Sequence, residues 1–312
     1  MATLLAASRN GVLRAVEGGA GWTAERTLDA DVRCLAADPT VAGRVWAGTQ
    51  GDGVHLSEDA GLTWRAAGLP GAIVKSVACS VAAPGTVYAG TKPPAVFRAA
   101  GAAGWVELAP FARRRSWFWR QPAERPSTPY VQALALAPAD PDILLAGIEA
   151  GAVVRSTNGG ASWSGHRHGA GRDCHQLAFA GERAVLEASG IGGARQSDDG
   201  GRTWRPARHG LHGGYGWSIA VDAGEPTRRY LAAAPTRRAH RADAHAHVYR
   251  SLGDGPWRPV LGRTATLPRL ATVEGLVFAA AGDLTWESTD HGEHWQPLPI
   301  SLDPRTALIA LD

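Results

Sequence analysis

The residues with the clearest chemical potential are histidines in the second half of the chain. Eight of the eleven histidines lie between positions 166 and 247, in the segments HRHGAGRDCHQ, RHGLHGGYGW and RRAHRADAHAH. A histidine side chain can transfer protons near neutral pH, hold an anion when protonated, or ligate a metal when neutral. Asp173 precedes His175 by two positions, so its carboxylate can orient an imidazole for acid–base work.

These histidines either belong to ordinary polar loops or have one of two chemical roles. In the first, His175, His212, His240 and Lys75 form a catalytic set in which His or Lys moves protons and arginines hold an anion. In the second, a divalent metal is bound, with candidate ligands His175, His212, His240, His245 and His247. No spacing matches a zinc signature such as H-E-x-x-H, so the sequence identifies no cofactor.

A repeated eight-residue segment indicates which elements position these side chains. Its four best copies are SEDAGLTW (57–64), STNGGASW (156–163), SDDGGRTW (197–204) and STDHGEHW (288–295). Worn copies end at Trp22, Trp105 and Trp257, which gives seven tryptophans about 40 residues apart. Two longer gaps contain insertions, at 111–128 and 237–247. A period of this size is typical of repeat architectures such as propellers.

Each unit contains four short apolar runs bounded by Gly, Pro, Asp or Asn, which is typical of a propeller blade. The sequence therefore predicts an all-β chain, a single seven-bladed propeller over 1–312 with four-stranded antiparallel blades. TLLAASR (3–9) matches the second strand of a blade and TALIALD (306–312) matches the first. We expect the C-terminal strand to pair with the N-terminal blade and close the ring.

The pattern S-x-D-x-G-x-T-W, complete at 57–64 and 197–204, resembles the Asp-box or BNR motif. The whole chain is similar to the Asp-box propellers, which include sialidases, xyloglucanases, sortilin-type receptors and photosystem II assembly factors. The resemblance implies the fold and leaves the function open, because the superfamily has many functions. It also places the box between the third and fourth strands, on the rim opposite the usual binding face.

The acidic residues of the box are expected to be structural. An Asp or Asn side chain can accept backbone N–H groups of its own turn, and the following glycine supplies a left-handed backbone angle. The tryptophan then covers the turn and buries a large area. The residues assigned this role are Asp59, Asn158, Asp199 and Asp290.

Functional residues are then expected on the other rim, at the mouth of the central channel. Aligned inner strands place one residue per blade there: Arg33, Lys75, Gln132, His175, Trp217 and Arg269, with Ala307 in the first blade. Loops between second and third strands add Arg9, Gln50, Lys92, Glu149, Arg237 and Asp283, and Tyr215 lies near a loop end. This face is positive in sum, which favours a small anionic ligand such as a carboxylate or an acidic sugar.

Composition excludes several other classes. The net charge is +3 with a pI of about 9.0, and basic residues are mixed with 29 acidic ones, so no nucleic-acid partner is expected. No run approaches 18 apolar residues, and no signal peptide is evident, so we expect no membrane span and a cytoplasmic location. Three cysteines without a CxxC pair argue against a disulfide framework or structural zinc.

Three functions remain, and the sequence does not decide whether the protein is an enzyme. The first is a propeller that binds, and chemically transforms as a lyase, isomerase or hydrolase, a small anionic or sugar-like ligand. The second is a non-catalytic ligand-binding or assembly propeller with a protein partner. The third is a sialidase-like glycoside hydrolase, with Glu149 and either Asp283 or Asp52 as its carboxyl pair.

Sialidase features are incomplete in this chain. There is no R-I-P motif, and neither Tyr130 nor Tyr215 has an evident glutamate partner in the sequence. The insertion at 111–128 combines arginines with Trp117, Phe118 and Trp119, and we expect it to form a lid over the mouth, on the same face as the insertion at 237–247.

Overall fold

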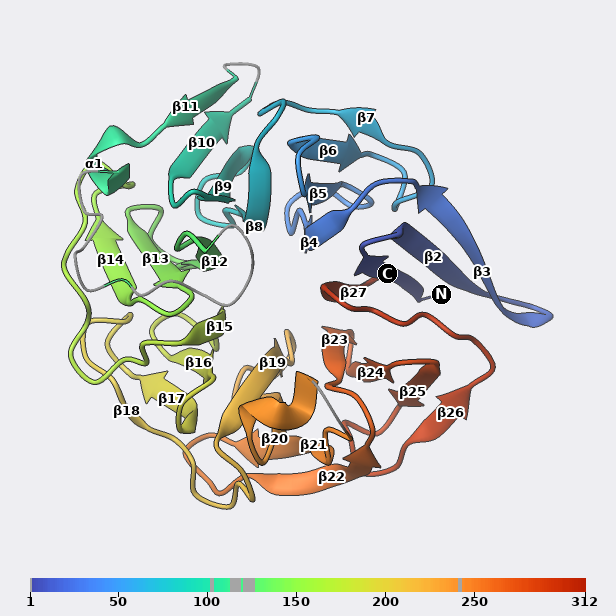
Figure 1. Ribbon diagram of the computed structural model, residues 1–312. Coiled ribbons are helices and arrows are strands. Elements are labelled where there is room, and N and C mark those ends of the chain that lie inside the picture. The colour runs from blue at the N-terminus through green and yellow to red at the C-terminus, as the bar shows by residue number, and fades with distance from the viewer. Residues whose placement is uncertain (1, 102–103, 113–118, 120–126, 241–242) are drawn as a thin grey trace.

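The computed structural model describes residues 2–101, 104–112, 119, 127–240 and 243–312. Seven small antiparallel sheets surround a common axis, and each sheet is one blade of a β-propeller (Figure 1). The predicted all-β, seven-bladed fold is confirmed. Helical structure in the described residues is limited to one turn of α-helix, α1 (Ala109–Ala112), and one 3-10 turn, η1 (Arg237–His240).

The blades follow the order of the chain around the ring. Blade 1 contains β27 (Ala307–Leu311), β1 (Thr3–Ser8), β2 (Gly11–Gly18) and β3 (Gly21–Leu28). Blade 2 contains β4 (Val32–Ala37), β5 (Val45–Thr49), β6 (Val54–Ser57) and β7 (Arg65–Ala66). Blade 3 contains β8 (Ile73–Cys79), β9 (Thr86–Lys92), β10 (Val96–Ala100) and β11 (Trp105–Glu107).

The second half of the ring continues in the same way. Blade 4 contains β12 (Val131–Leu136), β13 (Ile143–Ile148) and β14 (Val153–Thr157). Blade 5 contains β15 (Cys174–Phe179), β16 (Val185–Ser189), β17 (Gly193–Ser197) and β18 (Arg205–Pro206). Blade 6 contains β19 (Tyr215–Val221), β20 (Arg228–Ala234), β21 (Ala246–Leu252) and β22 (Arg258–Thr264). Blade 7 contains β23 (Arg269–Val273), β24 (Leu276–Ala281), β25 (Leu284–Ser288) and β26 (Gln296–Leu298).

Blade 4 lacks a regular fourth strand because side chains take over part of the hydrogen-bonding ladder. The hydroxyl of Ser164 accepts the N–H of Arg155 at 3.0 Å, and Nδ1 of His166 accepts the N–H of Val153 at 3.3 Å. The chain after Trp163 therefore runs beside β14 without forming a strand. This is the one blade in the described chain that departs from the four-stranded pattern.

The core lies between the blades. Successive residues of a strand face opposite sides, so a second strand packs against both neighbouring blades. Leu4 packs in a cluster with Phe278 of blade 7, whereas Leu5 packs in a cluster with Val45 of blade 2. This two-sided burial explains why second strands such as β1, β13 and β24 are apolar at nearly every position.

The ring is closed by the two ends of the described chain. β27 pairs antiparallel with β1, from Thr3 opposite Leu311 to Ala7 opposite Ala307. Leu308 and Leu311 are buried in the clusters on the two sides of this blade. The predicted completion of the first blade by the C-terminal strand is confirmed, and it leaves no open inner edge.

The four repeated turns are held by their own side chains. In the turn at 197–204, Oδ1 of Asp199 accepts the N–H groups of Arg202 and Thr203 at 2.9 and 2.8 Å. Ser197 accepts the N–H of Gly201 at 2.8 Å, and Gly201 has a φ of +80°. The turns around Asp59, Asn158 and Asp290 repeat these contacts. This geometry is compatible with the Asp-box resemblance, and hydrogen bonding lowers the pKa of Asp199 to about 2 against the opposing effect of burial.

Three of these turns are also tied to the preceding blade by an arginine. Arg14, Arg155 and Arg250 lie on the third strands of blades 1, 4 and 6. Their guanidinium groups donate to the turn carbonyls of Ala60, Gly200 and His291, at 3.0, 2.7 and 2.9 Å respectively. We call these contacts the arginine latches. They join the outer parts of adjacent blades.

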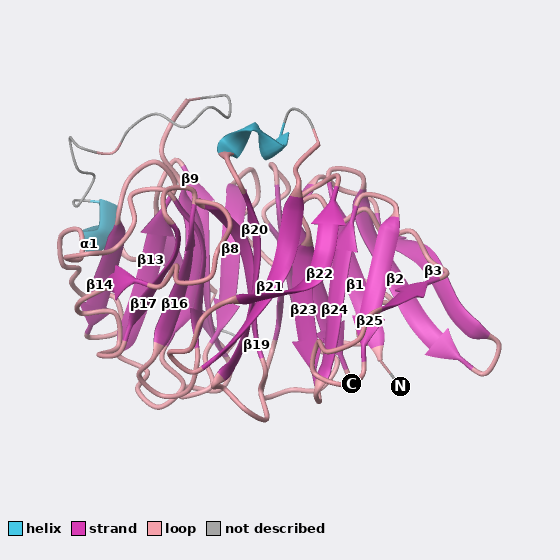
Figure 2. Cartoon of the chain, turned by 90° about the horizontal axis from the view of Figure 1, so that it is seen from below, coloured by secondary structure: helices cyan, strands magenta, loops and turns pink. Residues whose placement is uncertain are grey.

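The two rims of the propeller differ in content (Figure 2). η1 lies on one rim, and both ends of the chain lie at the other. Because β1 starts at the rim of the chain ends, loops between second and third strands lie on the η1 rim and the repeated turns on the opposite one. Most of the first insertion, at 113–118 and 120–126, is outside the described residues, as are the expected lid aromatics Trp117 and Phe118. No helix in the described part of the chain is long and apolar enough to cross a membrane.

Candidate functional site

The inner strands carry β-bulges at the channel mouth. In five blades the register of the first strand skips one residue: Arg33, Lys75, Gln132, His175 and Trp217. A bulge leaves its extra residue unpaired and re-aims the side chain. These are five of the seven aligned mouth positions. Arg269 differs, because it pairs regularly with Ala280, and Ala307 pairs with Ala7.

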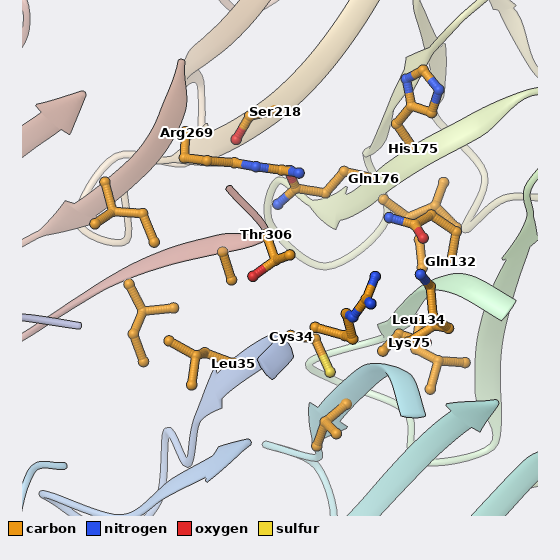
Figure 3. A pocket seen from close by; sticks show the side chains of 18 of the residues that line it. Cys34, Leu35, Lys75, Gln132, Leu134, His175, Gln176, Ser218, Arg269 and Thr306 are labelled. Carbon is orange, nitrogen blue, oxygen red and sulfur yellow. The ribbon is translucent and has the colours of Figure 1, made fainter. Parts of the chain in front are cut away.

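The channel contains a cavity of about 170 Å³ at the level of these residues. Arg33, Lys75, Gln132, His175, Arg269 and Ala307 all line it, so the inner strands bring six of the seven aligned positions together. Figure 3 shows Arg269, Thr306 and Gln132 arranged around the same space from different blades. Trp217 is the exception, since it lines a neighbouring cavity.

Many other polar residues of the channel hold the blades together. Gln176 forms two hydrogen bonds with the backbone of Ile219 in blade 6, at 3.1 and 2.9 Å. Ser76 donates to the Val131 carbonyl at 2.9 Å, and Thr306 donates to the Val32 carbonyl at 2.8 Å. Their hydrogen-bonding capacity is used between blades, which separates them from the mouth residues.

Arg269 is a buried cation beside an aromatic ring. Its guanidinium carbon lies 4.3 Å from the centroid of Trp217, and one of its N–H groups donates to the Arg305 carbonyl at 3.3 Å. Nε of Arg269 is buried without a hydrogen-bond partner. Burial lowers the pKa of Arg269 to about 10, although Tyr215 and Glu149 act in the opposite direction. Among the described residues, no carboxylate lies within 4.0 Å of this guanidinium.

Lys75 and Lys92 meet over one tyrosine. Their Nζ atoms lie 4.6 and 5.1 Å from the ring centroid of Tyr130, and both lysines are buried. Glu149 accepts a hydrogen bond from the Tyr130 side chain. Burial raises the pKa of Glu149, while His175 and Lys75 oppose this rise. Within the described residues, the cluster places two lysines and the carboxyl group of Glu149 at the border of the mouth.

The hydrogen bond between Tyr130 and Glu149 corrects the expectation from sequence that Tyr130 lacks a glutamate partner. Tyr130 precedes β12 and Glu149 follows β13, and the Glu149 N–H also donates to the Tyr130 carbonyl at 3.2 Å. The two residues therefore flank one antiparallel hairpin. Pairing the two strands in the sequence would have revealed this contact.

His175 is buried between three groups. Its Nδ1 lies 2.7 Å from the Gly216 carbonyl, so this nitrogen carries a proton and Nε2 is directed elsewhere. Nε2 lies 3.8 Å from Oδ1 of Asp173, which is ion-pair range and longer than a hydrogen bond. The rings of Tyr215 and Trp217 each pack at 5.0 Å. Asp173 and His175 thus form a carboxylate–imidazole pair, of which His175 lines the channel cavity.

A second acid–base pair lies next to the first. The Tyr215 hydroxyl is 2.6 Å from Nε2 of His240, and the His240 ring packs edge-on against Trp217 at 4.8 Å. Burial raises the pKa of Tyr215, with Asp173 and Glu149 adding to the effect. Burial, together with His175 and Arg269, lowers the pKa of His240. Both shifts favour a neutral tyrosine that donates to a neutral histidine.

The other residues expected at the mouth contribute less to its positive charge. Arg33 forms a two-pronged ion pair with Asp31, at 2.7 and 2.8 Å, so part of its charge is neutralised. Arg9, Arg237 and Asp283 are exposed and do not line the channel cavity. The sequence-based charge sum of the face omitted Asp31 and Asp173. Arg269, in contrast, has no ion-pair partner among the described residues.

The five candidate metal-ligating histidines are divided among three places. His175 and His240 lie on either side of Trp217. His212 and His247 pack around Tyr249, and His245 lies 3.8 Å from Asp243. Within the described ranges, no three His, Cys, Asp or Glu side chains gather in a way that could hold a metal ion. His212 therefore belongs to a different cluster from the rest of the expected catalytic set.

The expected carboxyl pair also changes in the structure. Asp283 is exposed and accepts a hydrogen bond from Ser301 at 3.2 Å, and Asp52 is exposed. The carboxylate whose charge acts on Glu149 is Asp173. Asp173 was named from sequence as a partner for an imidazole. Its effect on Glu149 was not foreseen.

Comparisons with known proteins agree on the fold. No protein-family model and no curated protein matches the chain. Among solved structures, an ancestral GH74 enzyme is similar with 17% identity and a TM-score of 0.65, covering 86% of this chain and 38% of the enzyme's chain. This chain therefore spans about two fifths of that enzyme.

Two further structures are similar over most of their length. YCF48 bound to D1 peptide has 14% identity and a TM-score of 0.57, covering 86% of this chain and 81% of its own. A chain of the nidogen/laminin complex has 10% identity and a TM-score of 0.54, covering 100% and 99%. The likeness is one of fold. At these identities it does not transfer an activity, a ligand or a partner.

Proposed function

We propose that the protein binds a small carboxylate-bearing ligand at the mouth of its central channel. The observation that carries the proposal is the state of Arg269, a buried guanidinium that lines the cavity without an ion-pair partner among the described residues. Burying an uncompensated charge is costly, and an anion from solution would supply the missing partner. A planar guanidinium also matches the geometry of a carboxylate.

The lysine cluster supports the same conclusion. Lys75 lines the cavity that contains Arg269, and Lys92 lies over the same tyrosine as Lys75. Two ammonium groups near one cavity raise its potential and favour negative ligands. Glu149 limits this potential when it is ionised. The ligand is therefore expected to be a mono- or dicarboxylate.

The test is isothermal titration calorimetry with acetate, succinate and D-glucuronate. Arg269→Gln should weaken binding roughly 10- to 100-fold, because a charge-assisted hydrogen bond contributes about 1.5–3 kcal/mol. The matched control is Arg258→Gln, which removes an exposed arginine of β22. Equal affinity in wild type and Arg269→Gln, with both folded, would refute the proposal.

A second candidate is catalysis on the bound carboxylate by proton transfer. The Tyr215–His240 hydrogen bond of 2.6 Å and the Asp173–His175 pair favour it, because His240 and His175 line two neighbouring cavities and offer acid–base groups there. A lyase, isomerase or hydrolase reaction would fit. His175→Asn should then lower kcat about 100-fold, while ligand affinity falls by no more than about 10-fold, the effect of one lost contact. If a ligand binds tightly and is never converted, the protein is a non-catalytic binding propeller.

The same titrations test an assembly role, in which the propeller binds a protein partner. A short peptide with a free C-terminal carboxylate is included as a probe. If the peptide alone binds and Arg269→Gln abolishes that binding, the carboxylate recognised belongs to a polypeptide. If only the free small carboxylates bind, the assembly role loses its support.

A further inference from the structure

A second cavity of about 340 Å³ lies beside the channel mouth, between blade 6 and the segment that leads into β27. Its wall includes Trp217 and His240 on one side and Thr266, Asp303, Pro304 and Arg305 on the other. Its size falls within the range of small-molecule sites.

The two cavities share a wall. Trp217 lines the second cavity and stacks on Arg269, which lines the first. The Arg305 carbonyl, from another residue of the second cavity, accepts a hydrogen bond from the same guanidinium. A single small molecule can therefore place one group against Arg269 and another in the second cavity.

The lining of the second cavity combines an apolar surface with polar edges. Trp217, Leu267 and Pro304 supply ring and aliphatic surface. Asp303 is fixed by Nε of Arg305 at 2.9 Å, so its remaining acceptor positions have a defined direction. The hydroxyl oxygen of Thr266 is buried without a hydrogen-bond partner. A buried unpaired hydroxyl is costly, and a ligand hydroxyl would satisfy it.

These observations restrict the chemistry of the occupant. A flat aryl group would cover Trp217 and leave the polar edge at Thr266 and Asp303 unsatisfied. A short aliphatic acid would leave the cavity empty. A pyranose ring has a C–H face that packs on an indole and hydroxyl groups at its edge that bond to Thr266, Asp303 and His240.

We propose that the ligand is a sugar acid of the hexuronate type, with its carboxylate at Arg269 and its hydroxylated ring in the second cavity. This inference rests on the proposed function, because it uses the same carboxylate site. It adds the class of the ligand. It also gives a role to η1, whose His240 forms one wall of the cavity.

The experiment compares probes that separate the two cavities by isothermal titration calorimetry. The probes are D-glucuronate, D-galacturonate, acetate, D-glucose and benzoate. At least one hexuronate should bind at least 10-fold more tightly than acetate. D-glucose should bind more weakly than that hexuronate, and benzoate should gain nothing over acetate.

Variants test whether the tighter binding of hexuronates comes from contacts in the second cavity. Thr266→Val should weaken hexuronate binding roughly 3- to 10-fold, the effect of one hydrogen bond, and should leave acetate unchanged. Thr285→Val is the matched control, since it removes another buried, unpaired hydroxyl that lines neither cavity. Circular dichroism and thermal unfolding verify that both variants fold.

The results separate a failure of the sugar-acid inference from a failure of the proposed carboxylate site. If acetate and hexuronates bind equally and both depend on Arg269, the carboxylate site stands and the sugar-acid inference is overturned. The same holds if benzoate binds more tightly than the hexuronates. If no carboxylate binds the wild-type protein, the proposed function itself fails.

Discussion

At the scale of single residues, buried ionisable groups determine how the channel mouth responds to ligand and pH. Arg269, Lys75 and Lys92 are buried, and Glu149 and Asp173 are carboxyl groups near them in the described part of the chain. Burial disfavours the charged forms of Arg269 and Glu149, so small changes in local charge can shift the pKa of either group. Glu149 should make ligand binding depend on pH, and Glu187 should make the free energy of unfolding depend on pH.

Binding of hexuronate should strengthen as the pH falls. Burial raises the pKa of Glu149, so this carboxyl becomes neutral at a higher pH than an ordinary glutamate. As the pH falls through that raised pKa, the mouth loses one negative charge and attracts a carboxylate more strongly. Calorimetry between pH 8 and pH 5 should show this rise. In Glu149→Gln, affinity should already be high at pH 8 and vary less, and an unchanged slope would exclude Glu149 as the cause.

Stability should also depend on pH through Glu187 on β16. This buried carboxyl accepts the Gly171 N–H at 2.8 Å, and burial raises its pKa from 4.5 to about 7. Ionising it opposes folding, so the free energy of unfolding should fall as the pH rises from 4.5 through 7, by roughly 3 kcal/mol. Urea unfolding of Glu187→Gln should show a flatter profile. Glu182→Gln, at an exposed position, should keep the wild-type slope.

At the scale of elements, the bulges of the inner strands and the loops before them position the site. The loop that ends in Asp173 and the bulge at His175 approach the start of the turn after β16 closely. A Cβ at Gly190 would lie 2.0 Å from Oδ2 of Asp173 and 2.9 Å from Cε1 of His175. Only glycine leaves room for this carboxylate–imidazole pair.

Gly190→Ala should therefore disturb the site more than the fold. The carboxylate of Asp173 is part-exposed and can move, so we expect a loss of less than about 1 kcal/mol in the free energy of unfolding. Hexuronate affinity should fall roughly 10-fold, because His175 leaves its place at the cavity. Gly165→Ala is the matched control, since a Cβ at Gly165 would meet no atom within 4 Å. Equal effects of the two variants on binding would contradict this role of Gly190.

A substitution in an arginine latch should instead lower stability and leave ligand binding unchanged. Arg155→Gln removes the donor to the Gly200 carbonyl, a contact of 2.7 Å between blades 4 and 5. The variant should lower the free energy of unfolding by about 1–2 kcal/mol and leave carboxylate affinity unchanged, because the latch is on the rim opposite the mouth. Urea unfolding and calorimetry measure the two quantities. A loss of affinity without a loss of stability would show that the latch communicates with the mouth.

At the scale of the whole molecule, the sequence predicts the fold well because its strongest signal is local and repeated. Each of the four best copies of the turn contains its own hydrogen-bond acceptors, glycine and tryptophan, so most of its hydrogen bonds are local. Seven copies count the blades. The matching strands at 3–9 and 306–312 predict the ring closure between β1 and β27.

The site could be predicted only in part. Strand alignment places six aligned positions around one cavity, because the alignment follows the fold's own repeat. It does not reveal the bulges, the ion pair of Arg33 with Asp31 or the contact of Tyr130 with Glu149, since these depend on register and on side-chain direction. The sequence also does not reveal that blade 4 lacks a regular fourth strand, because this depends on hydrogen bonds accepted by the side chains of Ser164 and His166.

The most direct test of the central claim is a crystal structure of the protein soaked with D-glucuronate. We expect density in the channel mouth, with the carboxylate within hydrogen-bond distance of Arg269 and the ring against Trp217. Density confined to the rim of the repeated turns, or an empty mouth at saturating ligand, would contradict it.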